Sequence, residues 1–229
     1  MKQTKLFHAF DDKPPIEYRP NTSDEAIIDA VIVKKQEYAF PNFKPNLIFD
    51  IGGNIGVVAV VLANIYPDAK IYSFEPVKEN FDILKRNTEY YKNISAIQCG
   101  LGNKTEHRMI FKSSDPSNLG GFSTFIKDGG ENSEIALVKM ETICNEFGTP
   151  DLIKIDVEGA EYEILGDIPD IENVKWIAGE LHGVNDYKLL DLLDKKFNLQ
   201  LARNFMDKVW HFHAVSKNWT HEGPDRTLP

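Results

Sequence analysis

The sequence is poor in cysteine and in basic clusters, and it has no long apolar run. Its 229 residues include two cysteines, Cys99 and Cys144, which stand apart and outside any CxxC pair. We expect both to be reduced packing residues, with a disulfide as the alternative. No apolar stretch reaches the roughly 18 residues needed to cross a bilayer, and the first residues lack the apolar region of a secretory signal. We therefore expect a cytoplasmic protein without a membrane span.

The charge balance is acidic, with 26 basic and 35 acidic residues and a formal net charge of −9. Non-specific affinity for nucleic acid comes largely from neutralised phosphates. Because no lysine and arginine cluster is present, we expect no nucleic-acid partner. At 42% hydrophobic and 27% charged residues, the chain is typical of one globular domain with a buried core. Its oligomeric state stays open, with a homodimer as one arrangement.

The chain divides into three parts. Residues 1–45 are expected to form an N-terminal arm and a lid helix, because prolines crowd the first twenty residues and a capping box runs from Thr22 to Glu25. The predicted helix ends before Pro41. Residues 46–217 form the main domain, which contains an insert at 103–140. Residues 218–229 form a polar tail.

From residue 46 onward, strand patterns alternate with helix patterns. Strands are expected at 47–50, 70–75, 94–99, 151–156 and 175–180, and helices at 57–66, 77–91, 141–147, 161–165 and 187–195. This alternation predicts an α/β fold with a doubly wound, mostly parallel sheet. The last two strands, at 199–203 and 209–215, have no helix-length connection and should run antiparallel. We expect His211 and His213 to be ordinary edge-strand residues.

The insert breaks this alternation. Residues 109–112 and 135–139 have strand patterns. The segment 113–133 between them is rich in Gly, Ser, Asn and Asp and is typical of a flexible loop. We expect this loop and the segment 22–40 to cover the site and to become ordered when substrate binds.

The turn after the first strand has the character of a cofactor site. Asp50-Ile-Gly-Gly-Asn-Ile-Gly56 joins a strand to a helix, where doubly wound sheets bind small molecules. Glycines let a ligand approach the backbone, and the helix N-terminus offers free N–H groups. The dinucleotide pattern GxGxxG fails, because Asn54 and Val57 stand where it needs glycine. The spacing is DxGxxxG instead.

Glu75 ends the second strand, 19 residues after Gly56. A carboxylate at this strand end can accept hydrogen bonds from both hydroxyls of a ribose, and a ribose without a phosphate favours an adenosyl cofactor over NADP. The third strand ends in Cys99-Gly-Leu101 at the same edge of the sheet. These features together predict S-adenosylmethionine as the cofactor.

Three motifs together resemble the FkbM family of methyltransferases. They are Phe49-Asp-Ile-Gly-Gly-Asn-Ile-Gly56, Phe74-Glu-Pro76 and Ile153-Lys-Ile-Asp-Val-Glu-Gly-Ala-Glu161. The third motif is the specific one, because it is not a general feature of Rossmann-like folds. The resemblance covers residues 22–215. It implies a class I methyltransferase sheet of seven strands with an antiparallel last strand, and O-methylation of sugars or secondary metabolites.

The resemblance also implies a cofactor site. Its residues would be Asp50, Gly52, Gly53, Asn54, Gly56, Glu75, Pro76, Gly100, Leu101 and Asp156. The glycine turn would surround the methionine end of the cofactor, Glu75 would hold the ribose, and the end of the third strand would border the adenine. Gly53 stands where many family members carry alanine, a departure that we expect to be harmless.

Methyl transfer to a hydroxyl needs a base or a metal, because a sugar hydroxyl is a very weak acid. Asp156 ends the fourth strand, Glu158 follows it, and His182 ends the fifth. We expect these three as catalytic residues at the cofactor's edge of the sheet, with His182 as the general base. In the alternative, Asp156, Glu180 and His182 hold a divalent ion, Mg²⁺ or Mn²⁺. Glu161 is expected to stabilise a helix N-terminus.

The expected function is S-adenosylmethionine-dependent O-methylation of a sugar, nucleotide-linked or in a glycan, or of a small secondary metabolite. An N- or protein methyltransferase of the same fold and a non-catalytic adenosyl-binding module are the alternatives. The sequence has no Asn/Asp-Pro-Pro-aromatic run near the fourth strand, which disfavours N-methylation of adenine or cytosine. The pair Asp156 and His182 disfavours a non-catalytic module, which would need neither.

Overall fold

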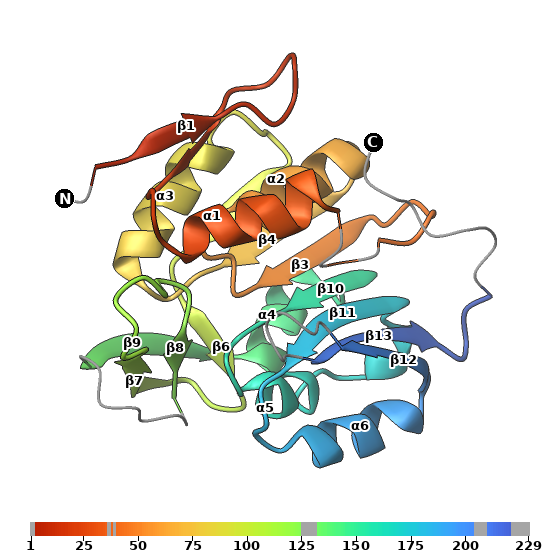
Figure 1. Ribbon diagram of the computed structural model, residues 1–229. Coiled ribbons are helices and arrows are strands. Elements are labelled where there is room, and N and C mark those ends of the chain that lie inside the picture. Colours follow the sequence, from red (N-terminus) through yellow and green to blue (C-terminus); the bar gives the residue numbers. More distant parts are fainter. Residues whose placement is uncertain (1–2, 36–37, 39, 125–131, 204–209, 221–229) are drawn as a thin grey trace.

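The computed structural model describes residues 3–35, 38, 40–124, 132–203 and 210–220. Its centre is a seven-stranded sheet in the order β12-β13-β11-β10-β3-β4-β5 (Figure 1). The strands are β3 (Leu47–Ile51), β4 (Lys70–Phe74), β5 (Ile94–Ile97), β10 (Leu152–Ile155), β11 (Trp176–Leu181), β12 (Phe197–Arg203) and β13 (Trp210–Ser216). Each lies where the sequence predicts a strand, with ends that differ by a few residues.

The strand directions confirm the predicted Rossmann-like α/β fold. β3, β4, β5, β10 and β11 pair in parallel, whereas β13 runs antiparallel to both β11 and β12. The interpretation of His211 and His213 as edge-strand residues is wrong, because β13 lies between two strands. The final hairpin inserts its second strand into the sheet, and strand alternation along the chain does not reveal this order.

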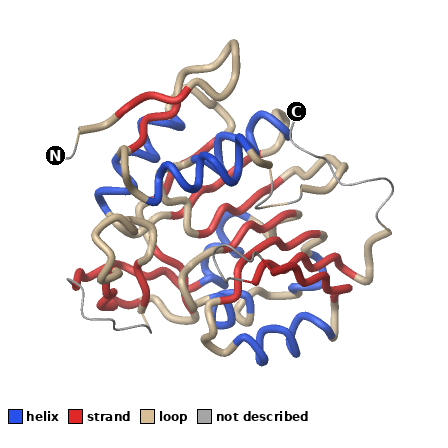
Figure 2. Tube along the Cα trace, in the orientation of Figure 1, coloured by secondary structure: helices blue, strands red, loops and turns tan. Residues whose placement is uncertain are grey.

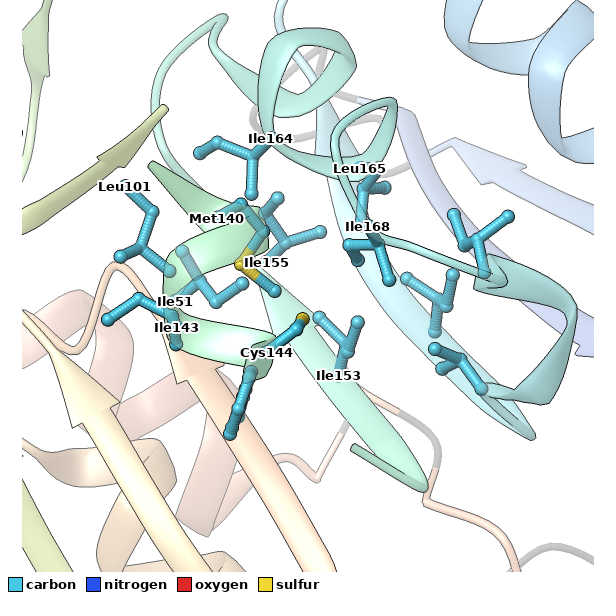
Figure 3. Close-up of a cluster of buried hydrophobic side chains, with 14 of the residues drawn as sticks. Ile51, Leu101, Met140, Ile143, Cys144, Ile153, Ile155, Ile164, Leu165 and Ile168 are labelled. Atoms are coloured by element: carbon cyan, nitrogen blue, oxygen red, sulfur yellow. The ribbon is translucent and has the colours of Figure 1, made fainter. Parts of the chain in front are cut away.

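Helices cover both faces of the sheet (Figures 1 and 2). α2 (Val57–Ile65) and α3 (Lys78–Thr88) lie on one face, and α4 (Met140–Phe147), α5 (Glu161–Leu165) and α6 (Asp186–Asp194) on the other. Because side chains alternate along a strand, Ile48 packs against α2 and Phe49 packs on the α4 side. Figure 3 shows the α4 side, where Ile153 and Ile155 of β10 meet Met140.

Both cysteines contribute to this packing. Cys99 and Cys144 are free and buried, as expected. Burial raises the pKa of each thiol to about 11. Both therefore remain protonated at neutral pH and act as small apolar groups.

Residues 3–20, within the segment expected to form an N-terminal arm, contain a hairpin. β1 (Lys5–Phe7) and β2 (Ile16–Tyr18) pair antiparallel and lie beside α3 (Figure 1). The Asn87 side chain accepts a hydrogen bond from the Glu17 N–H and donates one to the Glu17 carbonyl. Arg86 pairs with the Glu17 carboxylate at 2.7 Å. Strands of three residues are too short to show a period in the sequence.

The predicted helix after Thr22 is present. α1 (Ser23–Ile28) continues as a single π-helical stretch, Asp29–Val33, which ends well before Pro41. Its N-cap is Thr22, as expected, and the Thr22 hydroxyl accepts from the Asp24 N–H. The Asp24 carboxylate is fully buried and accepts two hydrogen bonds from the Arg19 guanidinium. This pair fixes the start of the helix.

The insert and the three residues before it form a second sheet, the insert sheet, in the order β6-β9-β7-β8. Its strands are β6 (Gly100–Gly102), β7 (Glu106–Lys112), β8 (Phe122–Ser123) and β9 (Asn132–Lys139). Both predicted strands are present and longer than expected. Strand β8 lies inside the segment predicted as a loop, of which residues 125–131 lie outside the described residues.

Little of the predicted tail is described. Trp219 packs against Phe43, with 4.9 Å between ring centroids, and residues 221–229 lie outside the described part. Among the described residues, no helix combines the length and the apolar character needed to span a membrane.

Candidate active site

A cavity opens at the carboxyl ends of β3, β4 and β10, between the main sheet and the insert sheet. Because parallel strands end at the same edge, residues far apart in the sequence meet here. The predicted site residues that line it are Gly52, Glu75, Pro76, Gly100, Leu101, Asp156 and Glu158. Gly120, Phe122 and Thr124 of the predicted lid loop also line it. The cavity therefore joins most of the implied cofactor site to two of the expected catalytic residues.

The glycine turn forms one wall of this cavity. Gly52 has φ +81°, and Gly56, the N-cap of α2, has φ +89°. Both angles favour glycine. A Cβ at Gly52 would lie 1.9 Å from the Asp156 carbonyl oxygen. The turn after β3 and the loop after β10 are therefore in backbone contact, and no side chain fits between them.

Four predicted cofactor residues support this turn without lining the cavity: Asp50, Gly53, Asn54 and Gly56. Asp50 is completely buried and accepts a 2.6 Å hydrogen bond from the Ser73 hydroxyl. Its other oxygen lies 3.7 Å from the Lys154 ammonium. Burial raises the pKa of Asp50, and the charge of Lys154 opposes that rise. Asp50 lies beneath the turn.

Gly53 packs against Ser73, whose hydroxyl donates a hydrogen bond to Asp50. A Cβ at Gly53 would lie 2.2 Å from Ser73 Oγ and 2.6 Å from Leu84 Cδ1. Glycine at this position therefore leaves room for the Ser73 hydroxyl. The departure from the alanine of many family members thus has a structural partner, Ser73, on the next strand of the chain, β4, and no sequence motif links the two positions.

Glu75 is anchored by two backbone N–H groups. Its Oε2 accepts from the Asn54 N–H at 2.9 Å, and its Oε1 accepts from the Val77 N–H at 2.8 Å. Burial raises the pKa of Glu75 to about 7, against the effect of these two bonds. Each oxygen keeps a further lone pair. The carboxylate can therefore accept hydrogen bonds from ribose hydroxyls while it stays in place.

Four carboxylates surround His182 at the ends of β10 and β11. Its Nδ1 lies 2.8 Å from Glu161 Oε1. Its Nε2 lies 3.5 Å from Asp156 Oδ1, 3.5 Å from Glu180 Oε2 and 3.7 Å from Glu158 Oε2. The structure thus brings together the three expected catalytic residues and Glu180. We call these five residues the His182 cluster.

The backbone of Glu158 is strained. Its φ is +54°, an uncommon angle for a residue with a side chain, and Gly159 follows with φ +108°. The Ser123 hydroxyl of the insert donates a 2.6 Å hydrogen bond to the Glu158 carbonyl. Strain of this kind concentrates at functional sites. Here it marks the loop that carries Glu158 into the cavity.

The His182 cluster changes the ionisation of its members. Burial lowers the pKa of His182, but hydrogen bonds to Glu161 and Glu180 outweigh burial and raise the pKa to about 12. Burial and the charge of Asp156 raise the pKa of Glu158 to about 7. A protonated imidazole has no lone pair to accept a proton. A carboxylate with a pKa near neutral pH, such as that of Glu158, can accept a proton there.

Glu161 contacts His182, which the sequence does not predict. Its carboxylate is buried and bonds to His182 as well as to the N–H groups of Val157 and Gly159, both at 3.2 Å. A carboxylate in the first turn of a helix has an ordinary explanation in the helix dipole. The helix-dipole explanation does not predict that Glu161 also contacts the His182 imidazole.

Two other residues reach the site from distant segments. The Tyr38 hydroxyl donates to Asp156 Oδ2 at 3.5 Å, and His211 Nδ1 lies 3.7 Å from Glu180 Oε1. Glu180 and His211 are register partners on β11 and β13. No motif links these positions to the site, and only the order of strands in the sheet could have placed His211 there.

Comparison with known proteins agrees with this geometry. Residues 50–207 match the methyltransferase FkbM domain. The chain belongs to the FkbM family of methyltransferases. It is therefore a methyltransferase, of a family that depends on S-adenosylmethionine. The matched residues include the glycine turn, Glu75 and the whole His182 cluster.

Relatives of this FkbM methyltransferase come from fungi, bacteria and archaea. It is 28% identical to methyltransferase sdnD of Sordaria araneosa, over 72% of this chain and 79% of that protein. It is 22% identical to 31-O-demethyl-FK506 methyltransferase FkbM of Streptomyces tacrolimicus, over 61% and 66%. It is 24% identical to hexuronic acid methyltransferase AglP of Haloferax volcanii, over 66% and 62%.

Solved structures share the fold. The fibrillarin pre-rRNA processing protein of Methanococcus jannaschii superposes with a TM-score of 0.52 at 14% identity, over 93% of this chain and 83% of that one. Fibrillarin of Aeropyrum pernix, in complex with natively bound S-adenosyl-L-methionine, gives 0.50 at 12% identity, over 82% and 74%. At such identities the likeness concerns the fold alone.

Proposed function

We propose that this FkbM methyltransferase methylates a hydroxyl of a sugar, nucleotide-linked or in a glycan, or of a small secondary metabolite. The observation that carries the proposal is the cavity that Asp156 and Glu158 share with Gly52 and Glu75. Proton-accepting carboxylates thus lie beside the cofactor residues, as O-methylation requires. Two relatives support this class of acceptor, since one is named for hexuronic acid and one for 31-O-demethyl-FK506.

The residues of the site have distinct roles in this proposal. When bound, S-adenosylmethionine supplies an electrophilic methyl group. Glu75 holds the ribose, and Gly52 lets the cofactor lie against the backbone. Glu158, ionised above its pKa of about 7, accepts the proton of the attacking hydroxyl. His182, held as an imidazolium by Glu161, balances the charge of the carboxylates.

A divalent ion such as Mg²⁺ or Mn²⁺ is the alternative means of activating the hydroxyl. Ligand atoms of Asp156, Glu158 and His182 all lie within 4.8 Å of one another, a spacing that fits one ion. The sequence suggested Glu180 in place of Glu158, and both lie at similar distances from His182. Carboxylate oxygens suit these ions. A bound ion would lower the pKa of the acceptor hydroxyl.

A methyl-transfer assay separates these possibilities. Purified protein is incubated with S-adenosylmethionine and panels of nucleotide sugars, lipid-linked sugars and polyketides, with and without EDTA. Turnover that survives EDTA favours Glu158 as the base, whereas loss that Mg²⁺ or Mn²⁺ restores favours the ion. Methylation of amines or proteins instead of hydroxyls would contradict the proposal. Cofactor binding without turnover on any acceptor would favour a non-catalytic module.

A further inference from the structure

Lys154 carries a positive charge into the middle of the main sheet. Its neighbours Ile153 and Ile155 on β10 pack on the α4 side, so Lys154 points to the opposite face, where its side chain is 3% exposed. A buried ammonium group is costly unless it is paired, and well-packed apolar groups are often at least as stable as a buried ion pair. Stability alone therefore gives little reason for a lysine at this position.

The Lys154 ammonium joins two parts of the active site. It donates a 2.8 Å hydrogen bond to the Gly52 carbonyl in the cofactor turn. It also lies 3.7 Å from Asp50 Oδ1 and 3.9 Å from Asp156 Oδ2. Lys154 and Asp50 are register partners on β10 and β3. The Tyr38 ring covers the ammonium, with 5.7 Å between Nζ and the ring centroid.

We propose that Lys154 is a positioning residue that holds the cofactor turn and the loop of Asp156 at the separation needed for methyl transfer. This inference rests on the proposed function. Gly52 and Asp156 line the same cavity and touch through their backbones, and Lys154 bonds to the first and attracts the second. Without it the two loops shift relative to each other. A displacement of about 1 Å at a reacting centre costs on the order of 10²-fold in rate.

A simpler role for Lys154 would be to neutralise Asp50, and a double-mutant cycle separates the two. Lys154→Met keeps the length of the side chain and removes its charge. The substitution is made in the wild type and in the Asp50→Asn variant. Each product is compared with the protein of the same background that keeps Lys154. The measured quantities are kcat and the acceptor KM at saturating cofactor, together with the Kd for S-adenosylmethionine by calorimetry.

If Lys154 positions the two loops, Lys154→Met lowers kcat by about 10²-fold in both the Asp50 and the Asp50→Asn backgrounds, with little change in acceptor KM. If it only neutralises Asp50, the substitution leaves kcat unchanged in the Asp50→Asn background, which overturns the proposal. Should Lys154→Met alone fail to fold, the comparison of the double variant with Asp50→Asn still decides, because both charges are then absent.

Ile153→Val is the matched control for lost packing on the same strand. It lowers the urea midpoint and leaves kcat unchanged if the loops keep their separation.

If the wild type methylates no acceptor, the proposed function fails, and cofactor binding then tests Lys154 by itself. We expect Lys154→Met to weaken S-adenosylmethionine binding by about tenfold or more in the Asp50→Asn background, through loss of its bond to Gly52. Equal affinity would overturn the inference.

Discussion

Glu75 is buried, and the role proposed for it needs its charge. With a pKa of about 7, the carboxylate is expected to bind either a proton or the ribose hydroxyls. We expect affinity for S-adenosylmethionine to fall below about pH 7, by up to about tenfold per pH unit. Glu75→Gln should weaken binding by about 1.5–3 kcal/mol above that pH and remove the pH dependence. Calorimetry across this range checks both effects, and a pH-independent wild type would contradict them.

The same pKa shift acts on stability with the opposite sign. The folded protein keeps the Glu75 proton up to about pH 7, whereas the unfolded chain releases it near the usual 4.5. The contribution of Glu75 to the unfolding free energy therefore decreases as the pH rises from about 4.5 to about 7. We expect Glu75→Gln to gain stability over the wild type between pH 4 and pH 8, measured by urea unfolding. If the variant gains no stability relative to the wild type, the pKa of Glu75 lies near its usual value.

Glu158 is the residue at which the mechanism is most directly tested. We expect Glu158→Gln to lower kcat by about 10²–10⁴-fold, the usual contribution of a positioned base, with little change in cofactor affinity. Wild-type kcat should rise with pH through about 7, as Glu158 ionises, and this rise should be absent in the variant. Unchanged kcat in Glu158→Gln would remove it from the mechanism. Asp191→Asn, at an exposed surface pair, is the matched control.

At the residue scale, the sequence predicts site residues where a pattern has one chemical explanation. Gly52, Gly56 and Glu75 follow strand ends at spacings that suit a cofactor, and Asp156 and His182 end neighbouring strands. The sequence does not predict a site residue that has another structural explanation, as Glu161 has at the start of a helix. The sequence also fails to predict ionisation, because the pKa of His182 depends on three carboxylates from different elements: Glu161 of α5, Glu180 of β11 and Asp156 after β10.

At the scale of elements, the insert is tied to the N-terminal helix. The Ser23 hydroxyl at the start of α1 accepts hydrogen bonds from the N–H groups of Leu119 and Gly120, at 2.9 and 3.1 Å. Asn80 of α3 donates to the Leu119 carbonyl at 3.0 Å. Since Gly120, two residues before β8, lines the cavity, these bonds hold part of the predicted lid against the cavity.

We expect hydrogen exchange in residues 113–124 to slow when cofactor and acceptor bind, because bound ligands oppose opening of this cover. Ser23→Ala should speed exchange in the same residues of the free protein, because two backbone N–H groups lose their acceptor. Ser216→Ala, remote from the lid, should not. Exchange that is equally fast with and without ligands would show that the segment is not a lid.

The sequence predicts the long elements better than the short ones. Strands β3, β10 and β11 are buried on both faces and bounded by turns, so their apolar runs are easily read. The hairpin of β1 and β2 has three residues in each strand, and its stability comes from contacts with α3 that lie about 70 residues further along the chain. Local sequence patterns do not predict such long-range contacts.

At the scale of the whole molecule, the cofactor should stabilise the folded state, because it binds the assembled strand ends and not the unfolded chain. S-adenosylmethionine at about 100 times its Kd should raise the unfolding free energy by about 2.7 kcal/mol. NAD should have no effect, because the glycine turn lacks the GxGxxG pattern. Thermal or urea unfolding with each ligand measures this. Stabilisation by NAD would contradict the assignment of the turn.

The overall fold was predictable because alternating strands and helices admit few arrangements. The position of β13 inside the sheet was not, since it depends on packing between the last hairpin and β11. Fold also leaves the acceptor open. A chain with net charge −9 shares its architecture with a pre-rRNA processing protein, so the architecture alone does not name the acceptor.

The contact between Gly53 and Ser73 bears on how this sequence can vary. Alanine at position 53 would overpack the turn, at a cost of typically 1–3 kcal/mol, because its Cβ would meet the Ser73 hydroxyl. In a Ser73→Ala background that hydroxyl is absent, and Gly53→Ala should cost less. The order of the two changes therefore matters. An evolutionary path between glycine and alanine at this position is more accessible when the serine is lost first, so a residue of the turn after β3 and a residue of β4 are expected to change together.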